Sequence, residues 1–227
     1  LIQPGEFDKN VANLAPDYSL PDACIKRINE RGLYIPHNLF VVGTVNMDDT
    51  THQFSRKVID RAMTIEMNGG NLEDMFGHSA DLDYSDNPNP LSDFQSKYIT
   101  ADEVLNAHSD VAEDIMADLP AKLEEINKCL EGTPFQVSYR VLNELCVYLG
   151  VLLNDGVAYQ EAVDAAVDQI TLMKILPRIE GDQDLLGVGD DSKLAQLMAK
   201  FAPETDSYKK LKEMNDRLEG GFTRFWP

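Results

Sequence analysis

An apolar run followed at once by polar residues is the most informative pattern in this chain. Residues 39–42 read Leu-Phe-Val-Val, and a polar cluster follows them: Thr44, Asn46, Asp48, Asp49, Thr50 and Thr51. Such a run predicts a buried strand of the parallel type. Ligands of open α/β sheets bind at the carboxyl ends of the strands. The pattern therefore indicates part of a catalytic site at a strand end.

A basic segment with Arg56, Lys57 and Arg61 comes next, and a second short strand is expected at residues 62–67. The order of strand, polar tip, short basic helix and strand predicts the end of an α/β core over residues 36–68.

Two less regular stretches flank this core. Residues 1–35 form an irregular lead-in with a short helix expected at residues 22–30, because Pro21 precedes it and Gly32 follows it. Residues 69–97 are rich in Gly, Pro, Asp and Asn, which predicts an acidic loop insertion.

Residues 98–227 carry apolar positions at helical spacing, which predicts an α-helical domain. Its first helix opens with a capping box, since Glu103 lies three residues after Thr100. Helices are expected over residues 100–107, 111–130, 135–153, 159–176, 192–201 and 206–218. The predicted fold class is mainly α with a small α/β portion.

Composition narrows the function classes. The chain has 227 residues, 43% of them hydrophobic, and 20 basic against 39 acidic residues give a formal net charge of −19. A nucleic-acid surface normally needs a basic face, so no direct nucleic-acid face is evident. No apolar run is long enough to span a membrane. Three scattered cysteines without a CxxC pair fit a reducing cytoplasm, and the histidines lack metal-ligand spacing. Leu1 is not an initiator methionine, which favours a fragment or a processed product.

The polar cluster and the basic segment suit phosphoryl transfer. The Asn46 amide could hydrogen-bond a phosphate oxygen and an attacking water, and Asp49 could orient that water or a metal-bound group. Arg56 and Arg61 could neutralise charge on the transferred group. The residues alone also allow a simpler interpretation, in which Asn46 and its acidic neighbours form a hydrogen-bonded turn and Arg61 a surface ion pair.

Two stretches, GTVNMDDT at residues 43–50 and FSRKVIDRAMTIEM at residues 54–67, resemble the second half of the AAA+ core of McrB-type nucleoside triphosphatases. These are the motors of modification-dependent restriction systems. The resemblance implies that Asn46 is the sensor-1 asparagine, that Asp49 is the signature aspartate, and that Thr44 lies at the nucleotide. The family pattern is broken at other positions of this stretch: Val45, Thr50 and Thr51.

The same resemblance implies a role for the basic segment. Arg61 falls on an arginine of the family and would be the arginine finger, acting in trans on the nucleotide of an adjacent subunit. Arg56 is a weaker candidate for that role.

The helical part also resembles this family. Residues 138–145 (SYRVLNEL) and 169–182 (QITLMKILPRIEGD) are similar to the lid helices of McrB-like ATPases. The resemblance makes Arg140 a sensor-2 candidate, with an ordinary surface arginine as the alternative. Arg178 is a weaker candidate.

A phosphate-cradling GxxxxGK[ST] loop is absent from the sequence. The nearest segment, GVGDDSK at residues 187–193, is expected to be a loop between helices with Ser192 as a cap. The resemblance therefore implies the C-terminal part of an AAA+ P-loop NTPase core with its helical lid bundle. The half that binds the nucleotide phosphates would lie upstream, outside this chain, or would have been lost.

The resemblance implies that the complete protein hydrolyses ATP or GTP with Mg²⁺. It would act as a homo-oligomeric ring, with a nuclease effector as a possible partner. The expected biological role is DNA restriction or phage defence. The chain alone is expected to be inactive and to bind no cofactor tightly. Two alternatives stay open. The chain could be a degenerate AAA+ remnant that serves as an acidic helical protein-interaction module, or an adaptor that contributes Arg61 in trans to another protein's nucleotide.

Overall fold

The structure, a computed structural model, describes residues 3–7, 22–35, 39, 41–46, 55–67, 98 and 100–226. The chain divides into two units, Leu1–Val45 and Asn46–Pro227. The described part is mainly helical.

The first unit contains the predicted helix, α2, over Asp22–Arg31. Gly32 follows it with φ of 76°, a backbone conformation that glycine adopts without a steric penalty. The amide of Gly5 donates to the carbonyl of Asn29 over 2.9 Å. The side chain of Phe7 is buried.

The predicted strand at residues 39–42 is wrong for the residues that the structure describes there. Leu39, Val41 and Val42 are in irregular backbone, and Val41 and Val42 are 91% and 87% exposed. A strand is stable only when a neighbour satisfies its backbone groups and covers its apolar face. The described ranges offer no such neighbour to this segment.

The second predicted strand, at residues 62–67, is wrong for the same reason. Its backbone is irregular, and Ile65 and Met67 are 73% and 90% exposed. The short basic helix between the two predicted strands is confirmed as α3, Arg56–Ile59. The loop predicted at residues 69–97 lies outside the described residues.

The predicted helices of the second unit are confirmed with small shifts of their ends, and α6 continues through Pro120. Their bounds are Ala101–Ala107 (α5), Ala112–Cys129 (α6), Tyr139–Asn154 (α7), Tyr159–Ile170 (α8), Lys193–Met198 (α10) and Asp206–Glu219 (α11). A short helix, α9, spans Gln183–Leu186, and a 3-10 turn, η4, spans Gly189–Asp191. The capping box of Thr100 and Glu103 is present, and Ser192 caps α10 as expected.

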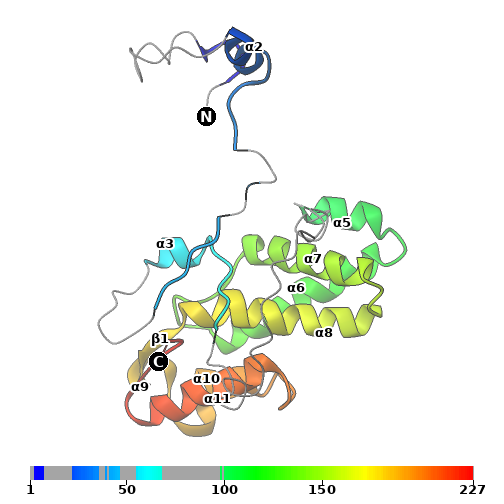
Figure 1. The fold of residues 1–227 in the computed structure, drawn as a ribbon. Coiled ribbons are helices and arrows are strands. Elements are labelled where there is room, and N and C mark those ends of the chain that lie inside the picture. Colours follow the sequence, from blue (N-terminus) through cyan, green and yellow to red (C-terminus); the bar gives the residue numbers. More distant parts are fainter. Residues whose placement is uncertain are drawn as a thin grey trace, which may run out of the picture. The chain divides into compact units, whose positions relative to one another are not determined.

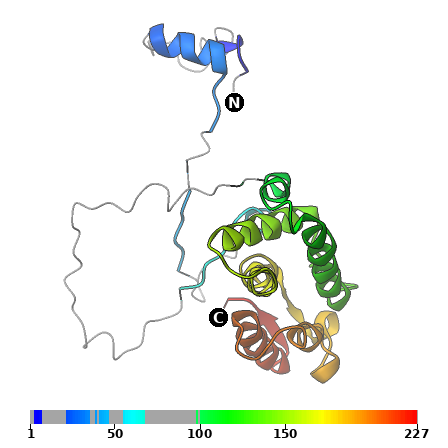
Figure 2. The same ribbon diagram turned by 90° about the vertical axis from the view of Figure 1, so that its right-hand side faces the viewer.

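Helix α8 lies at the centre of this unit (Figures 1 and 2). Viewed nearly end-on in Figure 2, it has α7 on one side and α11 on the other. The core side chains are fully buried and come from every long helix: Leu119, Ile126, Leu145, Leu149, Val163, Ile170, Leu211 and Met214. The carboxylate of Asp168 accepts from the amide of Ser207 over 2.9 Å and joins α8 to the start of α11.

The helix predicted over residues 159–176 changes its winding before it ends. After Ile170 the chain forms a π-helix, η2, over Thr171–Ile175, and then a 3-10 turn, η3, over Leu176–Arg178. Pro177, which lacks an N–H donor, lies within this 3-10 turn, and the helical stretch ends at Arg178.

A two-stranded antiparallel sheet closes the second unit. Strand β1, Glu180–Asp182, pairs with β2, Phe222–Arg224, with Gly181 opposite Thr223. This pair brings the end of the chain onto the segment that follows η3.

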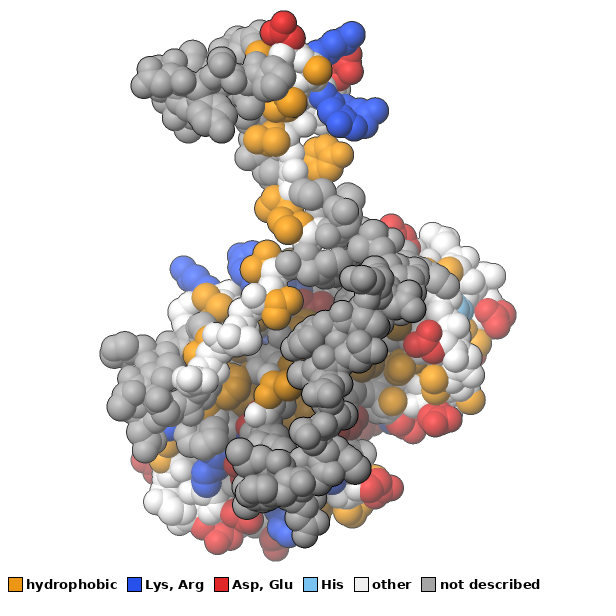
Figure 3. Space-filling model, viewed as in Figure 1, with side chains coloured by type: hydrophobic (Ala, Val, Ile, Leu, Met, Phe, Trp, Pro, Cys, Tyr) orange, Lys and Arg blue, Asp and Glu red, His pale blue; other side chains and the backbone are white. Residues whose placement is uncertain are grey.

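On the face drawn in Figure 3, acidic side chains of the described residues are visible at several separate places. Within the described ranges, no helix has both the length and the apolar character needed to cross a membrane.

Candidate functional site

A tight turn after α3 presents Arg61 to solvent. The amides of Arg61 and Ala62 both donate to the carbonyl of Val58, over 3.0 and 3.1 Å. Ile59, at the end of α3, is buried and fixes the base of the turn. Arg61 itself is exposed.

The buried ammonium group of Lys174 binds the backbone of this turn. It donates to the carbonyl oxygens of Asp60, at 3.2 Å, and Ala62, at 2.8 Å. It also forms an ion pair with Glu144 of α7 at 3.1 Å, and only 2% of the Lys174 side chain is exposed. The two residues on either side of Arg61 are therefore bound to the same buried cation.

Two further contacts join this segment to the helical unit. The guanidinium of Arg178 pairs with the carboxylate of Asp60 at 3.0 Å. The amide of Thr64 donates to the carbonyl of Met173, within the π-helix, over 3.2 Å. Both contacts come from the stretch where α8 gives way to η2 and η3.

A small pocket of about 60 Å³ lies beside the turn, lined by Asp60, Ser138, Arg140, Val141, Lys174 and Arg178. Three of these side chains are cationic and one is acidic. The pocket also meets the first turn of α7, the positive end of that helix. Pockets that enclose small-molecule ligands exceed about 300 Å³. The pocket suits one small anionic group, such as a phosphate, and does not enclose a nucleotide.

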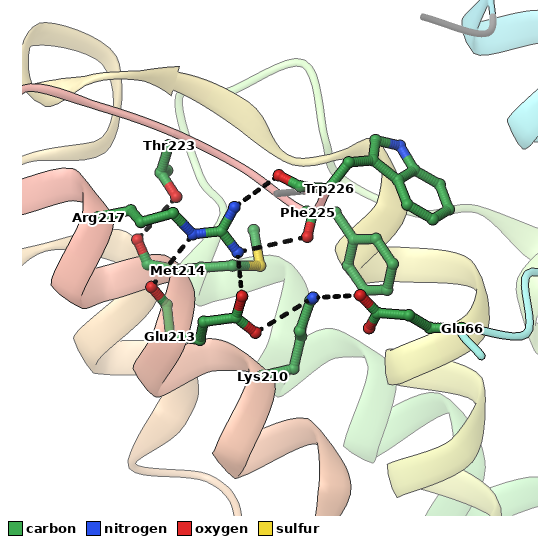
Figure 4. A network of polar contacts seen from close by, with 8 residues as sticks. All are labelled: Glu66, Lys210, Glu213, Met214, Arg217, Thr223, Phe225 and Trp226. Atoms are coloured by element: carbon green, nitrogen blue, oxygen red, sulfur yellow. Dashed lines mark hydrogen bonds and ion pairs between the residues drawn. The ribbon is translucent and has the colours of Figure 1, made fainter. Parts of the chain in front are cut away.

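A second buried cation anchors the chain beyond the turn (Figure 4). The ammonium of Lys210, on α11, lies 2.7 Å from Glu66 and 3.2 Å from Glu213, and its side chain is 4% exposed. It also lies 4.5 Å from the centre of the Phe225 ring. Arg217 donates to the carbonyls of Phe225 and Trp226 and pairs with Glu213. The end of the chain is thus part of the same network as residue 66.

The structure brings together some of the residues that the sequence singled out. Arg140 lines the pocket, and Arg61 lies in the turn that borders it. Arg56 begins α3, and nothing is described of its side chain. Thr44 and Asn46 lie in an exposed irregular segment, Thr44 in the other unit. Asp49 lies outside the described residues.

Sequence reasoning missed Lys174 and Asp60. The signal for Lys174 was a single charge in an apolar stretch, ITLMKILP, at residues 170–177. A buried ammonium is costly unless it is paired, so a lone lysine among apolar residues indicates a fixed ion pair. Asp60 offered no comparable signal, because its partners lie more than a hundred residues away in sequence.

The described residues contain no group of three or more acidic, histidine or cysteine side chains arranged to hold a metal ion.

Comparison with known proteins gives a family match for the helical part of the chain. Neither curated proteins nor solved structures give a match. One family model, described as a domain of unknown function (DUF8727), matches residues 90–221. That range covers α5 to α11 and more than half of the chain. The chain therefore belongs to the DUF8727 family.

Proposed function

We propose that the chain is the C-terminal half of an McrB-like AAA+ nucleoside triphosphatase, with the helical unit as its lid. The observation that carries the proposal is the cationic pocket of Arg140, Lys174 and Arg178 beside the turn that bears Arg61. In this role Arg140 and Arg178 of the pocket contact one phosphate group of a nucleotide, whereas the ammonium of Lys174 binds the carbonyl groups of the turn. Arg140 corresponds to the sensor-2 position of the resemblance.

The size of the pocket agrees with a partial site. Residues upstream of the chain would hold the base, the other phosphates and Mg²⁺ of ATP or GTP, since the chain lacks the loop that cradles phosphates. The same upstream strands would pair with the segments around Val41 and Ile65, whose apolar side chains are exposed here. A sheet assembled in this way would satisfy their backbone groups and cover them.

Arg61 would act on the nucleotide of a neighbouring subunit in a homo-oligomeric ring. Phosphoryl transfer needs positioning and charge neutralisation more than covalent chemistry. An exposed guanidinium on a rigid turn is suited to reach across a subunit interface. Asn46 and Asp49 would orient the attacking water at the nucleotide that their own subunit holds.

The experiment uses the whole protein and compares Arg61→Ala and Arg140→Ala with Lys212→Ala, an exposed lysine on α11. We expect Arg61→Ala to lower kcat for nucleotide hydrolysis by roughly 10³-fold, the effect of removing an arginine finger, with little change in nucleotide binding. Arg140→Ala is expected to lower kcat and weaken binding. Hydrolysis by Arg61→Ala at the wild-type rate would contradict the proposal.

A mixing experiment tests the action in trans. Subunits with Arg61→Ala are combined with subunits whose upstream phosphate-binding lysine is replaced. Neither kind should hydrolyse nucleotide alone, and the mixture should recover activity at those interfaces where an intact Arg61 meets an intact nucleotide site. No recovery would place Arg61 outside the neighbour's site.

The gene sequence upstream of Leu1 separates this proposal from a non-catalytic role. An in-frame GxxxxGK[ST] motif followed by an apolar strand ending in Asp-Glu supports the motor. Absence of both motifs would favour the degenerate remnant, with the acidic helical unit as a docking module, and would sink the motor.

A further inference from the structure

We propose that Lys174 is a positioning residue for Arg61, which it orients by binding the carbonyl groups on both sides of it. The inference rests on the proposed function of Arg61 in nucleotide hydrolysis. We call the two hydrogen bonds from Lys174 to the carbonyls of Asp60 and Ala62 the clamp. The clamp lies within the second unit and can be tested without measuring hydrolysis.

Two hydrogen bonds of Lys174 reach the backbone on both sides of Arg61. A lysine ammonium has three N–H donors and no acceptor. In this structure it donates to the carbonyl oxygens of Asp60 and Ala62, and the carboxylate of Glu144 lies 3.1 Å away as its ion-pair partner. Because both carbonyls are bound to the same buried cation, the two peptide groups that flank Arg61 are restrained. The side chain of Arg61 leaves the turn from a backbone that has little freedom.

The π-helix explains how Lys174 reaches the turn. A π-helical turn accommodates one residue more than an α-helical turn, and such turns are frequent at functional sites. Without that extra residue, Lys174 would lie about 100° further round the helix axis. The hydroxyl of Thr171, the first residue of the π-helix, is buried with no hydrogen-bond partner among the described residues, and an unsatisfied buried polar group is costly.

The clamp also joins the turn to the pocket. Glu144 and Arg140 are four residues apart on α7 and so lie on the same face of that helix. Asp60, whose carbonyl Lys174 binds, pairs through its carboxylate with Arg178, another residue of the pocket lining. A phosphate that draws Arg140 and Arg178 into the pocket would therefore act on the same groups that hold Arg61.

Hydrogen exchange on the chain itself tests the clamp. Lys174→Met keeps the length of the side chain and removes its donors. We expect the amides of Ala62 and Thr64 to exchange at least about tenfold faster, as the loss of hydrogen bonds from a charged donor implies. Amides of α6 should not change. Lys209→Met, which removes an exposed lysine paired with Asp206, is the matched control and should leave the turn unaffected.

Two further variants keep the test decisive if Lys174→Met does not fold. Lys174→Arg retains a cation and should restore part of the protection. Glu144→Gln leaves the carbonyl contacts in place and should change exchange at the turn less than Lys174→Met does. Unchanged exchange at Ala62 and Thr64 in folded Lys174 variants would overturn the proposal.

Hydrolysis by the whole protein tests the positioning role. Misplacing a catalytic group by about 1 Å costs roughly 100-fold in rate, so Lys174→Met should lower kcat to that extent with KM nearly unchanged. In the Arg61→Ala background the same substitution should cost nothing further, because there is no finger left to position. A full additional loss in the double variant would mean that Lys174 acts independently of Arg61 and would overturn the proposal.

The two readouts separate the possible failures. If exchange at the turn rises but Arg61→Ala hydrolyses nucleotide normally, the clamp is real and the proposed finger role of Arg61 is wrong. If Arg61→Ala is inactive but Lys174→Met keeps both slow exchange and full kcat, the proposed function stands and the positioning role is wrong.

Discussion

Two lysines with buried ammonium groups, Lys174 and Lys210, hold the segment after α3 against the helical unit. Burial of a charge is costly unless it is paired and hydrogen-bonded. Lys174 meets that condition with two backbone carbonyls and Glu144, and Lys210 with Glu66 and Glu213. At the scale of single residues, these cations do the work that strand pairing was expected to do for residues 62–67.

The three cysteines should differ sharply in reactivity. Cys24 is exposed, whereas Cys129 and Cys146 are buried, and burial raises the pKa of both buried thiols. Because the thiolate is the reactive form, a thiol reagent at pH 8 should label one cysteine per native chain and three after denaturation. Absorbance of the released reagent measures both values. Rapid labelling of a native Cys24→Ser variant would contradict this expectation.

The raised pKa of the Cys146 thiol implies that the stability of the fold depends on pH. Burial, with a smaller contribution from Asp102, raises its pKa from 9.0 to about 11. The folded state therefore binds this proton more tightly than the unfolded state, and the resulting stability is complete below pH 9 and is lost as the pH rises through 11. Two pKa units correspond to about 3 kcal/mol.

Melting temperatures between pH 8 and 11 for the wild type and Cys146→Ala check the sign. The difference between the two proteins should favour the wild type at pH 8 and shrink as the pH rises. A constant difference over this range would show that the thiol does not titrate in this way. Tyr148, whose pKa burial also raises, is common to both proteins and cancels in the comparison.

At the scale of elements, local signals predicted the helices well. The Thr100 capping box, the Ser192 cap and the apolar period of α7 each act within a few residues, and each is confirmed. The strands failed because the pairing that stabilises a strand is not local. The apolar run at residues 39–42 has the composition of a strand, but composition does not provide a neighbour.

The candidate site shows the same difference between local signals, which the sequence contains, and long-range contacts, which it does not reveal. Arg140 and Arg61 were proposed from the resemblance of short motifs, which does not indicate the residues around them. Lys174 binds the turn from a π-helix that replaces the α winding after Ile170, a change for which the sequence has no periodic signal. Contacts between Lys174 and Asp60 span more than a hundred residues, so no local rule could place them together.

The packing of α5 on α7 gives a prediction at this scale. Gly150 lies where α7 passes the fully buried Val104, and an added Cβ would come within 2.8 Å of both methyl groups of Val104 and 3.1 Å of the Tyr98 ring. Overpacking of this kind costs about 1–3 kcal/mol. Gly150→Ala should therefore lower the free energy of unfolding even though alanine favours a helix.

Chemical denaturation of Gly150→Ala and of Gly43→Ala provides the measurement. At Gly43 an added Cβ meets nothing within 4 Å, so that variant should unfold like the wild type. A stabilised Gly150→Ala variant would mean that α5 moves away from α7 without cost.

At the scale of the whole molecule, the family match and the candidate site overlap only in part. The matched range, residues 90–221, contains the pocket helices and both buried lysines. It excludes the turn with Arg61 and the Lys210 partner Glu66. It also excludes Phe225 and Trp226, whose carbonyls accept hydrogen bonds from Arg217. The segment with Arg61 and Glu66 lies outside the matched range but within the same compact unit, held there by ion pairs, backbone hydrogen bonds and the buried Ile59.

Lys210 is the residue that joins these parts, because its ammonium contacts Glu66, Glu213 and the ring of Phe225 (Figure 4). Removing one partner of a buried ion pair leaves the other charge uncompensated and costs about 3 kcal/mol. Lys210→Met should lower the free energy of unfolding by that order, and Glu66→Gln by less, since it retains a polar side chain.

The neighbouring Lys209 supplies the control for this prediction. Its ion pair with Asp206 is exposed on both sides, so Lys209→Met should change the free energy of unfolding by less than about 1 kcal/mol. If Lys210 acts through Glu66, the double variant Lys210→Met/Glu66→Gln should lose less free energy of unfolding than the sum of the two single losses. Denaturant unfolding of the wild type, the two single variants and the double variant measures this difference. Strictly additive losses would mean that Lys210 stabilises only α11 and the chain end. The segment that carries Arg61 would then depend on Lys174 and Arg178 for its attachment.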